Sequence, residues 1–384
     1  MRTLLLSRQR SGLDVSDHAG HPTVGAVPHA EGVRNMRAVM FENYGEFPVL
    51  TEVAKPRPKP GEVLLRVAGA GACHSDISVY RIFEEGDPGA QEPPFVLGHE
   101  NAGWVEELGP GVSERVQVGS AYLAYGPIGC GQCRKCVAGL ETYCENVASM
   151  PYLAVGLGRD GGMAEYMTVP AHHLVPLGDA DPVAAAPLSD AGLTPYHAIK
   201  ESLPHLAGGG RYALVIGLGG LGRIGVQILK ALTGATVIAT DVKEGARARA
   251  ESDGAVTVGA GEDQVERIRA LTGGRGVDAA FDFVGATPTL VTAMASMAQG
   301  GRCNLVGIAG GTHEFSFFAN PYETYVTNTY WGSVPDLWEV VDMYRAGQIR
   351  PEVERFAMDD ALKAYQKLEA GEINGRAVVT PNSG

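Results

Sequence analysis

The clearest chemical signal in the sequence is a run of four closely spaced cysteines. Cys130, Cys133, Cys136 and Cys144 form the pattern Cys-x2-Cys-x2-Cys-x7-Cys within a glycine-rich stretch. Four thiolates at this spacing predict a closed tetrahedral zinc site. A disulfide pair and an iron–sulfur cluster are the alternatives, although the last spacing fits a cluster poorly. Because four thiolates leave zinc no free position for a substrate, we expect the reaction to take place elsewhere.

A glycine-rich turn predicts a dinucleotide-binding site. Gly217, Gly219 and Gly222 follow an apolar strand at 212–216 and open a helix, and Asp241 ends the next strand. The glycines permit a tight turn and a close approach of pyrophosphate, and the helix N-terminus favours phosphate binding. A structural glycine turn is the alternative. Asp241 would accept hydrogen bonds from the ribose hydroxyls and repel a 2′-phosphate, which favours NAD over NADP. Three nearby cations could soften this preference: Lys243, Arg247 and Arg249.

Hydrophobic patterns predict an α/β protein of two domains. Short alternating runs over 36–183 predict a distorted β barrel. Alternating strand and helix patterns over 184–333 predict a doubly wound parallel sheet. Residues 334–384 contain two helical stretches and a final strand at 376–380, which we expect to rejoin the first domain. Residues 1–35 show no period and are expected to form a flexible extension; a docking arm is the alternative.

Composition excludes some classes of partner. The 384 residues include 31 Lys and Arg against 44 Asp and Glu, a formal charge of -13. This charge disfavours nucleic acid and anionic membrane surfaces. No run approaches the roughly twenty apolar residues needed to cross a bilayer. With four of six cysteines assigned to one metal, we expect a soluble protein in the reducing cytoplasm.

Two short motifs complete the chemical pattern. Cys73-His74-Ser75-Asp76 and Gly98-His99-Glu100 each follow an apolar run. For either motif alone, the alternative is a buried cysteine or a core histidine that binds no metal. With the cysteine-rich stretch and the dinucleotide turn, they resemble the zinc-dependent alcohol dehydrogenases of the medium-chain dehydrogenase/reductase family over residues 36–381. The resemblance is closest to bacterial NAD-dependent secondary alcohol dehydrogenases, whose segments are similar to 188–198 and 281–285.

This resemblance implies a specific architecture. A GroES-like catalytic domain would cover 36–183 and 334–384, with a structural zinc lobe at about 126–146. A Rossmann domain that binds NAD would cover 184–333.

The resemblance also implies a second, catalytic zinc. Cys73, His99 and Asp190 would hold it, with Asp190 in place of the cysteine of many relatives. Three protein ligands leave a fourth position for substrate or water. Glu100 matches a carboxylate thought to enter the zinc sphere during ligand exchange, although a structural role is equally open. Ser75 matches the hydroxyl that passes the substrate proton to the nicotinamide ribose. Ser78 stands where many relatives have histidine, so the outer end of this relay stays open.

Further site residues follow from the same resemblance. The cofactor-binding residues, besides those named above, would be Gly220, Leu221, Thr194, Val284, Val306, Ile308 and Arg376. Ala246 stands where some relatives have a lysine at the adenosine ribose. The candidate substrate pocket contains His74, Ser78, Leu157, Phe318, Tyr330 and Trp331.

The implied reaction is the reversible oxidation of secondary alcohols to ketones. Zinc would stabilise the alkoxide as a Lewis acid, and the alkoxide carbon would give hydride to nicotinamide. The apolar pocket residues favour small alcohols with apolar groups on both sides of the carbinol carbon. Primary alcohol, aldehyde and polyol dehydrogenases are alternatives, as is a non-catalytic nucleotide-binding redox sensor. We expect two zinc ions and NAD per chain, and a homodimer or homotetramer in which the strand at 325–331 pairs across a two-fold axis.

Overall fold

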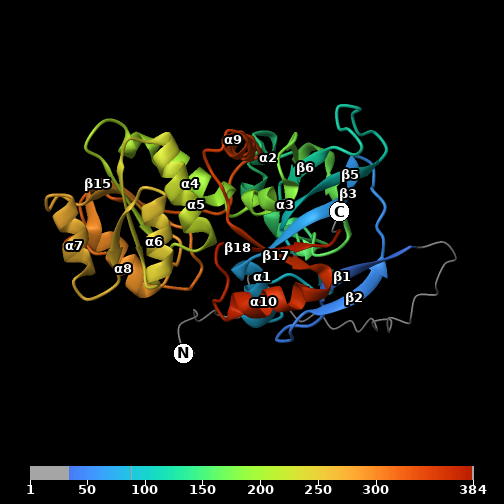
Figure 1. The fold of residues 1–384 in the computed structure, drawn as a ribbon, viewed down its shortest axis with the longest axis horizontal. Coiled ribbons are helices and arrows are strands. Elements are labelled where there is room, and N and C mark those ends of the chain that lie inside the picture. The colour runs from blue at the N-terminus through green and yellow to red at the C-terminus, as the bar shows by residue number, and fades with distance from the viewer. Residues whose placement is uncertain (1–33, 88, 383–384) are drawn as a thin grey trace, which may run out of the picture. The chain divides into compact units, whose positions relative to one another are not determined.

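The computed structural model describes residues 34–87 and 89–382 (Figure 1). The expected extension at 1–35 therefore lies almost wholly outside the described residues. Among the described residues, the first element is strand β1 (Asn35–Phe41).

Strands from both ends of the chain, most of them paired antiparallel, build the barrel part. A three-stranded sheet has the order β2 (Val49–Ala54), β1, β4 (Phe95–Val96). A larger sheet has the order β10 (Leu174–Pro176), β6 (Ala121–Ala124), β5 (Glu100–Leu108), β3 (Glu62–Ala72), β18 (Arg376–Thr380), β17 (Val353–Ala357), and β9 (Tyr166–Pro170) also pairs with β3. The pairing of β18 with β3 joins the end of the chain to its beginning.

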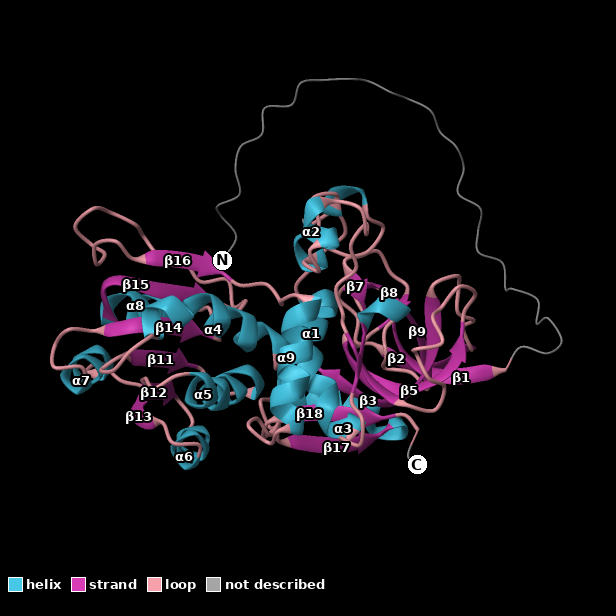
Figure 2. Ribbon diagram, turned by 90° about the horizontal axis from the view of Figure 1, so that it is seen from above, coloured by secondary structure: helices cyan, strands magenta, loops and turns pink. Residues whose placement is uncertain are grey.

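The second part of the chain is built around a six-stranded parallel sheet (Figure 2). Its order is β13 (Val256–Gly259), β12 (Thr236–Asp241), β11 (Tyr212–Ile216), β14 (Val277–Asp282), β15 (Met297–Leu305), β16 (Tyr325–Asn328). The strand order reverses between β11 and β14, and in open sheets of this kind ligands bind beyond the carboxyl ends of the strands at such a switch point. This is the predicted doubly wound sheet.

Helices cover both faces of the parallel sheet, which explains why its strands are apolar throughout. In β11, Ala213 and Val215 face one buried cluster, while Leu214 and Ile216 face another. Buried residues of three helices join the first cluster: α4 (Leu193–Leu206), α5 (Gly220–Leu232) and α6 (Glu244–Ser252). Two helices join the second: α7 (Gln264–Leu271) and α8 (Thr287–Ser296).

The remaining elements are short connections and two C-terminal helices. The short elements are α1 (His74–Arg81), α2 (Arg134–Val137), α3 (Pro182–Ala185), β7 (Ala154–Val155) and β8 (Gly158–Arg159). The C-terminal helices are α9 (Val334–Arg345) and α10 (Ala361–Glu369). Helix α9 begins with a capping box in which Ser333 and Asp336 each accept from the other's backbone.

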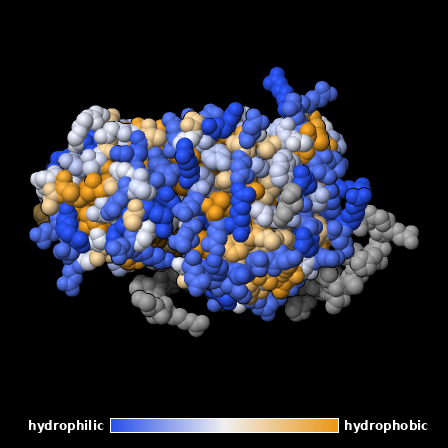
Figure 3. Space-filling model, in the orientation of Figure 1, coloured by the Kyte–Doolittle hydropathy of each residue, from blue (hydrophilic) through white to orange (hydrophobic). Residues whose placement is uncertain are grey.

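The surface is mainly polar on the face drawn in Figure 3, where hydrophobic side chains gather in separate patches. Among the described helices, none combines the length and the apolar character required to span a membrane.

Candidate active site

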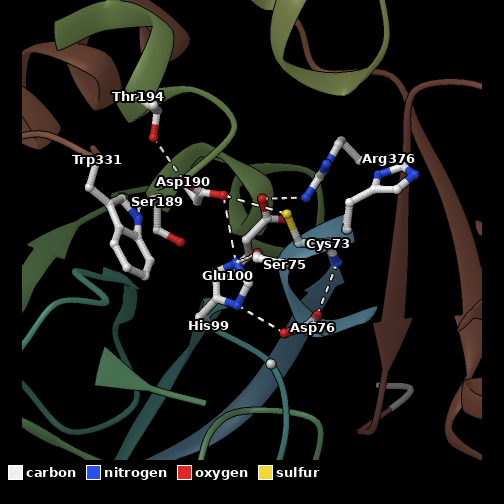
Figure 4. A network of polar contacts seen from close by, with 12 residues as sticks. Cys73, Ser75, Asp76, His99, Glu100, Ser189, Asp190, Thr194, Trp331 and Arg376 are labelled. Atoms are coloured by element: carbon white, nitrogen blue, oxygen red, sulfur yellow. Dashed lines mark hydrogen bonds and ion pairs between the residues drawn. The ribbon is translucent and has the colours of Figure 1, made fainter. Parts of the chain in front are cut away.

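Three side chains from different parts of the chain point toward one another (Figure 4). Cys73 caps α1 directly after β3, His99 precedes β5, and Asp190 lies just before α4. Asp190 Oδ2 lies 3.7 Å from Cys73 Sγ and 3.6 Å from His99 Nε2. The sequence-predicted catalytic ligands are therefore brought together.

The arrangement fits a tetrahedral zinc ion. Zinc bonds of about 2.3 Å to sulfur and about 2.0 Å to nitrogen or oxygen place neighbouring ligand atoms about 3.3–3.6 Å apart. The three ligand atoms all lie within 4.8 Å of one another. Burial lowers the pKa of His99, but Asp76 and Asp190 outweigh this effect and raise it well above its usual value. The carboxylates thus create an environment that favours a positive charge at this point.

Asp76 contacts both Cys73 and His99 through its carboxylate. It was not among the predicted site residues. It is fully buried, and its carboxylate accepts from the Cys73 backbone N–H at 3.0 Å. His99 Nδ1 lies 2.9 Å from Asp76 Oδ1. An imidazole that donates from Nδ1 presents an unprotonated Nε2 to the metal position, as a zinc ligand must. The segment Cys73-His-Ser-Asp contained the signal, since a carboxylate three residues after a ligand can reach back across one helical turn.

Glu100 and Arg376 form a buried ion pair beside the metal position. Burial raises the pKa of Glu100 to about 7, against the opposing effect of Arg376. The side chain of Arg376 also lies against Gly220, where an added Cβ would be 2.1 Å from Arg376 Cδ. Arg376 therefore lies between Glu100, the residue after His99, and the first turn of α5. This position agrees with the predicted pyrophosphate contact, which stays a prediction.

Two serines of the expected proton relay differ in their surroundings. Ser75 Oγ lies 3.1 Å from His99 Nε2, next to the metal position. The Ser78 hydroxyl donates to the His74 carbonyl at 3.1 Å and is buried. Ser75 therefore lies beside the metal position, while its part in a proton relay stays a prediction. The Ser78 hydroxyl donates its hydrogen within its own helix.

The predicted dinucleotide residues lie at the carboxyl edge of the parallel sheet. Gly217 has φ +86°, a conformation that favours glycine. An added Cβ on Gly222 would lie 1.8 Å from the Gly217 carbonyl oxygen, so only glycine permits this close packing. Asp241 ends β12, and its carboxylate accepts from the backbone N–H groups of Leu218 and Lys243 at 2.7 and 2.8 Å.

Other predicted cofactor residues follow neighbouring strands. Val284 follows β14, and Val306 and Ile308 follow β15 at the same edge. Thr194 donates to Asp190 Oδ1 at 2.8 Å and so orients a ligand. Leu221 lies in the first turn of α5, next to Gly220. The topology gathers these residues, while their contacts with a cofactor stay predictions.

The predicted substrate-pocket residues divide into two groups. The Trp331 ring stands edge-on to His99 at a centroid distance of 5.5 Å, and its indole N–H donates to the Ser189 carbonyl. Trp331 has φ +54°, which is unusual for a bulky residue and marks a local constraint. Leu157 is also buried. In contrast, His74, Phe318 and Tyr330 are exposed, and Phe318 is 87% exposed.

The four predicted cysteines of the other site also converge, and all six cysteines are free thiols. Cys133 Sγ lies 3.4 Å from Cys136 Sγ. Hydrogen bonds from the Gln132 backbone and from Asn146 lower the pKa of Cys130 to about 6. Burial raises the pKa of Cys136 to about 12, so a cation is needed to hold a thiolate there. This geometry favours a metal over disulfides.

The buried carboxylate of Glu141 connects the cysteine lobe to the barrel. This connection was not predicted from the sequence. Glu141 accepts from the Gly129 backbone at 2.8 Å, and its two oxygens lie 3.0 Å from His172 Nε2 and His173 Nε2. Because the histidines lie between β9 and β10, this cluster ties the lobe to the barrel sheet. Nothing in the local spacing indicates the contact.

Two family models match the chain. Residues 59–179 match the alcohol dehydrogenase GroES-like domain, and residues 220–344 match the zinc-binding dehydrogenase domain. Two curated relatives extend the similarity over 90% of the chain at 33% identity. The chain belongs to the zinc-dependent alcohol dehydrogenases of the medium-chain dehydrogenase/reductase family.

The two relatives carry different activities in their names. One is D-arabinose 1-dehydrogenase (NADP(+)) from Saccharolobus solfataricus, 97% of which is covered. The other is an NAD-dependent alcohol dehydrogenase from Sulfolobus acidocaldarius, 99% of which is covered.

Two solved structures share the fold. The alcohol dehydrogenase of Aeropyrum pernix matches with a TM-score of 0.82 and 35% identity, over 90% of this chain and 100% of its own. The acetophenone reductase of Geotrichum candidum, in complex with NAD, matches with a TM-score of 0.78 and 32% identity, over 93% and 99%. The predicted fold class and the alcohol dehydrogenase class are thus confirmed.

Proposed function

We propose that this family member oxidises secondary alcohols to ketones, and reduces ketones, with NAD and two zinc ions per chain. The observation that carries the proposal is the convergence of Cys73, His99 and Asp190 beside an arginine that also reaches the glycine-rich turn. The relatives that use NAD, and the acetophenone reductase that binds it, support this reading.

Separate groups of residues serve metal binding, proton transfer and hydride transfer. Cys73, His99 and Asp190 would hold zinc, which supplies Lewis acidity toward an alcohol or carbonyl oxygen when it is bound. Asp76 holds His99 with Nε2 directed at the metal position. Ser75, next to that position, accepts the substrate hydroxyl proton and passes it toward the ribose of the cofactor or to water. Thr194 fixes Asp190 from the other side.

The glycine turn orients the dinucleotide. Pyrophosphate would lie at the N-terminus of α5, where the backbone N–H groups of Gly219 and Gly220 and the Arg376 guanidinium favour negative charge. Within the described part of the chain, no heavy atom beyond its two neighbours lies within 4 Å of an ideal Cβ built on Gly219, so this side of the turn has space for a ligand.

Asp241 carries the proposed preference for NAD. Its carboxylate already accepts two backbone N–H groups, so it stays in place at the end of β12. We expect Asp241→Ser to lower the ratio of kcat/KM for NAD to that for NADP about 10-fold, because a repulsive charge is removed. Steady-state kinetics with both cofactors measures this ratio; an unchanged ratio would remove Asp241 as the selector.

An apolar wall carries the proposed preference for secondary alcohols. Trp331 and Leu157 are buried, and Trp331 packs against His99. The decisive assay is NAD reduction against matched primary, secondary, cyclic and polyhydroxy alcohols. Higher kcat/KM for secondary and cyclic alcohols supports the proposal. A clear preference for polyols or sugars, as the name of the arabinose dehydrogenase suggests for that relative, would contradict it.

A homodimer or homotetramer is the proposed assembly. Strand β16 pairs only with β15 among the described strands, and Tyr325 and Val326 are exposed on it. Pairing of two β16 edges would cover these residues. Val326→Lys should lower the mass measured by sedimentation, while an unchanged mass would locate the interface elsewhere.

We also propose a cytoplasmic location, because four of the six cysteines form a candidate metal site, which requires thiolates in reduced form. Thiol titration of protein freshly isolated without reductant should find no disulfide. A disulfide among the four lobe cysteines would contradict this location.

A further inference from the structure

We infer that Tyr365 is a positioning residue for the catalytic zinc ligands and that it acts through Asp76. This inference rests on the proposed function, because it assigns Tyr365 to the metal site formed by Cys73, His99 and Asp190. Tyr365 lies on α10, near the end of the chain, and was not among the residues predicted from the sequence.

Asp76 connects Tyr365 to two ligands at once. Its Oδ2 accepts from the Cys73 backbone N–H at 3.0 Å and from the Tyr365 hydroxyl at 3.1 Å. Its Oδ1 faces His99 Nδ1 at 2.9 Å. Each carboxylate oxygen thus has a donor, and the tyrosine shares the oxygen that holds the cysteine backbone.

The surroundings of this carboxylate leave no substitute for the phenol. Asp76 and Tyr365 are both fully buried, so bulk solvent does not supply a replacement donor to the Oδ2 atom. Burial raises the pKa of Tyr365 well above its usual value, which keeps the hydroxyl protonated and able to donate. Loss of this hydrogen bond would leave Asp76 with fewer constraints on its rotation, and both ligands depend on that rotation.

Helix packing holds the tyrosine in place independently of its hydroxyl. The ring of Tyr365 meets the ring of Tyr80 on α1 edge-on, with centroids 6.3 Å apart. Asp76 lies one helical turn before Tyr80 on the same helix. Helices α1 and α10 are therefore locked by aromatic packing, and the hydroxyl adds a specific contact to the metal site.

Tyr80 provides a matched control. It is as deeply buried as Tyr365, but its hydroxyl makes no hydrogen bond to Asp76, and the charged side chain that does most to raise its pKa, after burial, is Glu369. Tyr80→Phe and Tyr365→Phe each remove one buried oxygen from the same aromatic pair. Only Tyr365→Phe removes a donor from Asp76.

The test follows zinc release from the full-length zinc-loaded protein to an excess of a colorimetric chelator. We expect two phases, one for each site. Tyr365→Phe should accelerate zinc release from the Cys73–His99–Asp190 site about 3- to 10-fold. This effect is smaller than the roughly 10- to 100-fold typical when a group that contacts a metal ligand directly is lost, because Tyr365 acts through Asp76. The four-cysteine phase should stay unchanged in both variants, and Tyr80→Phe should match the wild type in both phases.

A second measurement separates positioning from general packing. In protein with cobalt at the catalytic position, Tyr365→Phe should shift the visible absorption bands and lower kcat, with KM for NAD unchanged. In Asp76→Ala protein, Tyr365→Phe should have little further effect, because the oxygen that accepts from the phenol is already gone.

Equal release rates in wild type and Tyr365→Phe would overturn the inference, as would an equal acceleration by Tyr80→Phe. Full additivity with Asp76→Ala would also overturn it. A wild-type protein that holds only the four-cysteine zinc would contradict the proposed function itself, which distinguishes that failure from a failure of the role of Tyr365.

Discussion

The two candidate metal sites are built in opposite ways. In the lobe, residues between Cys130 and Cys144 supply all four sulfur atoms, and backbone N–H groups of the same segment donate to them. In the active site, Cys73, His99 and Asp190 come from three separate elements. Carboxylates rather than backbone amides surround this second group, as Asp76 and Glu100 illustrate.

This difference explains how each site works. A local loop can form a closed site whose metal stabilises the loop. A site assembled from distant elements depends on the folded barrel for its geometry, and three ligands leave one position for a substrate. Changes in the lobe should therefore affect stability first, and changes in the second site should affect turnover first.

Asp190→Ala should produce the largest effect on turnover. The variant loses one of three metal ligands, so we expect the rate of alcohol oxidation to fall by about 1,000-fold or more. Loss of a group that only hydrogen-bonds to a metal ligand typically lowers activity by about 10- to 100-fold. Folding and NAD binding should persist, because Asp190 lies outside the glycine turn. NADH formation and NAD-binding titration measure the two properties, and wild-type activity in this variant would remove Asp190 from the ligand set.

Cys133→Ser should have its main effect on stability. The lobe then has three thiolates, and part of the metal-binding free energy that orders it is lost. We expect a clearly lower unfolding temperature by calorimetry and one zinc ion fewer per chain, while kcat of the folded fraction stays within about threefold of the wild type. If this variant instead folded normally and lost turnover, the division between the sites would be wrong.

The sequence predicts local features better than contacts between distant elements. The four cysteines, the glycine turn after β11 and the alternating strands were readable because neighbouring residues produce each pattern. The resemblance to a family supplied the set Cys73, His99 and Asp190, which spacing alone could not assemble. The contacts of Tyr365 with Asp76 and of Glu141 with His172 and His173 depend on side-chain packing across the fold, so they had no sequence signal.

Glu141→Gln should have a smaller, pH-dependent effect on stability. Burial opposes ionisation of Glu141, but hydrogen bonds with His172 and His173 outweigh it, so its pKa lies well below the usual range. A depressed carboxyl pKa stabilises the fold fully above the ordinary glutamate pKa of about 4.3, and this stabilisation is lost as the pH falls toward the folded-state pKa.

We therefore expect Glu141→Gln to cost about 1–2 kcal/mol at neutral pH, with a smaller difference from wild type below about pH 4. Denaturant unfolding across this pH range measures the change. A difference that stayed constant with pH would show that the charge on Glu141 does not anchor the lobe.

The most direct test of the two-site account is to record zinc release and NAD-dependent turnover together while a chelator acts on the wild-type enzyme. We expect about two zinc ions per chain, with turnover lost as the first zinc leaves. The second should leave with the loss of folded structure. Turnover that persisted after release of the first zinc, or that ended only when the lobe zinc left, would contradict the separation of catalysis from structural support.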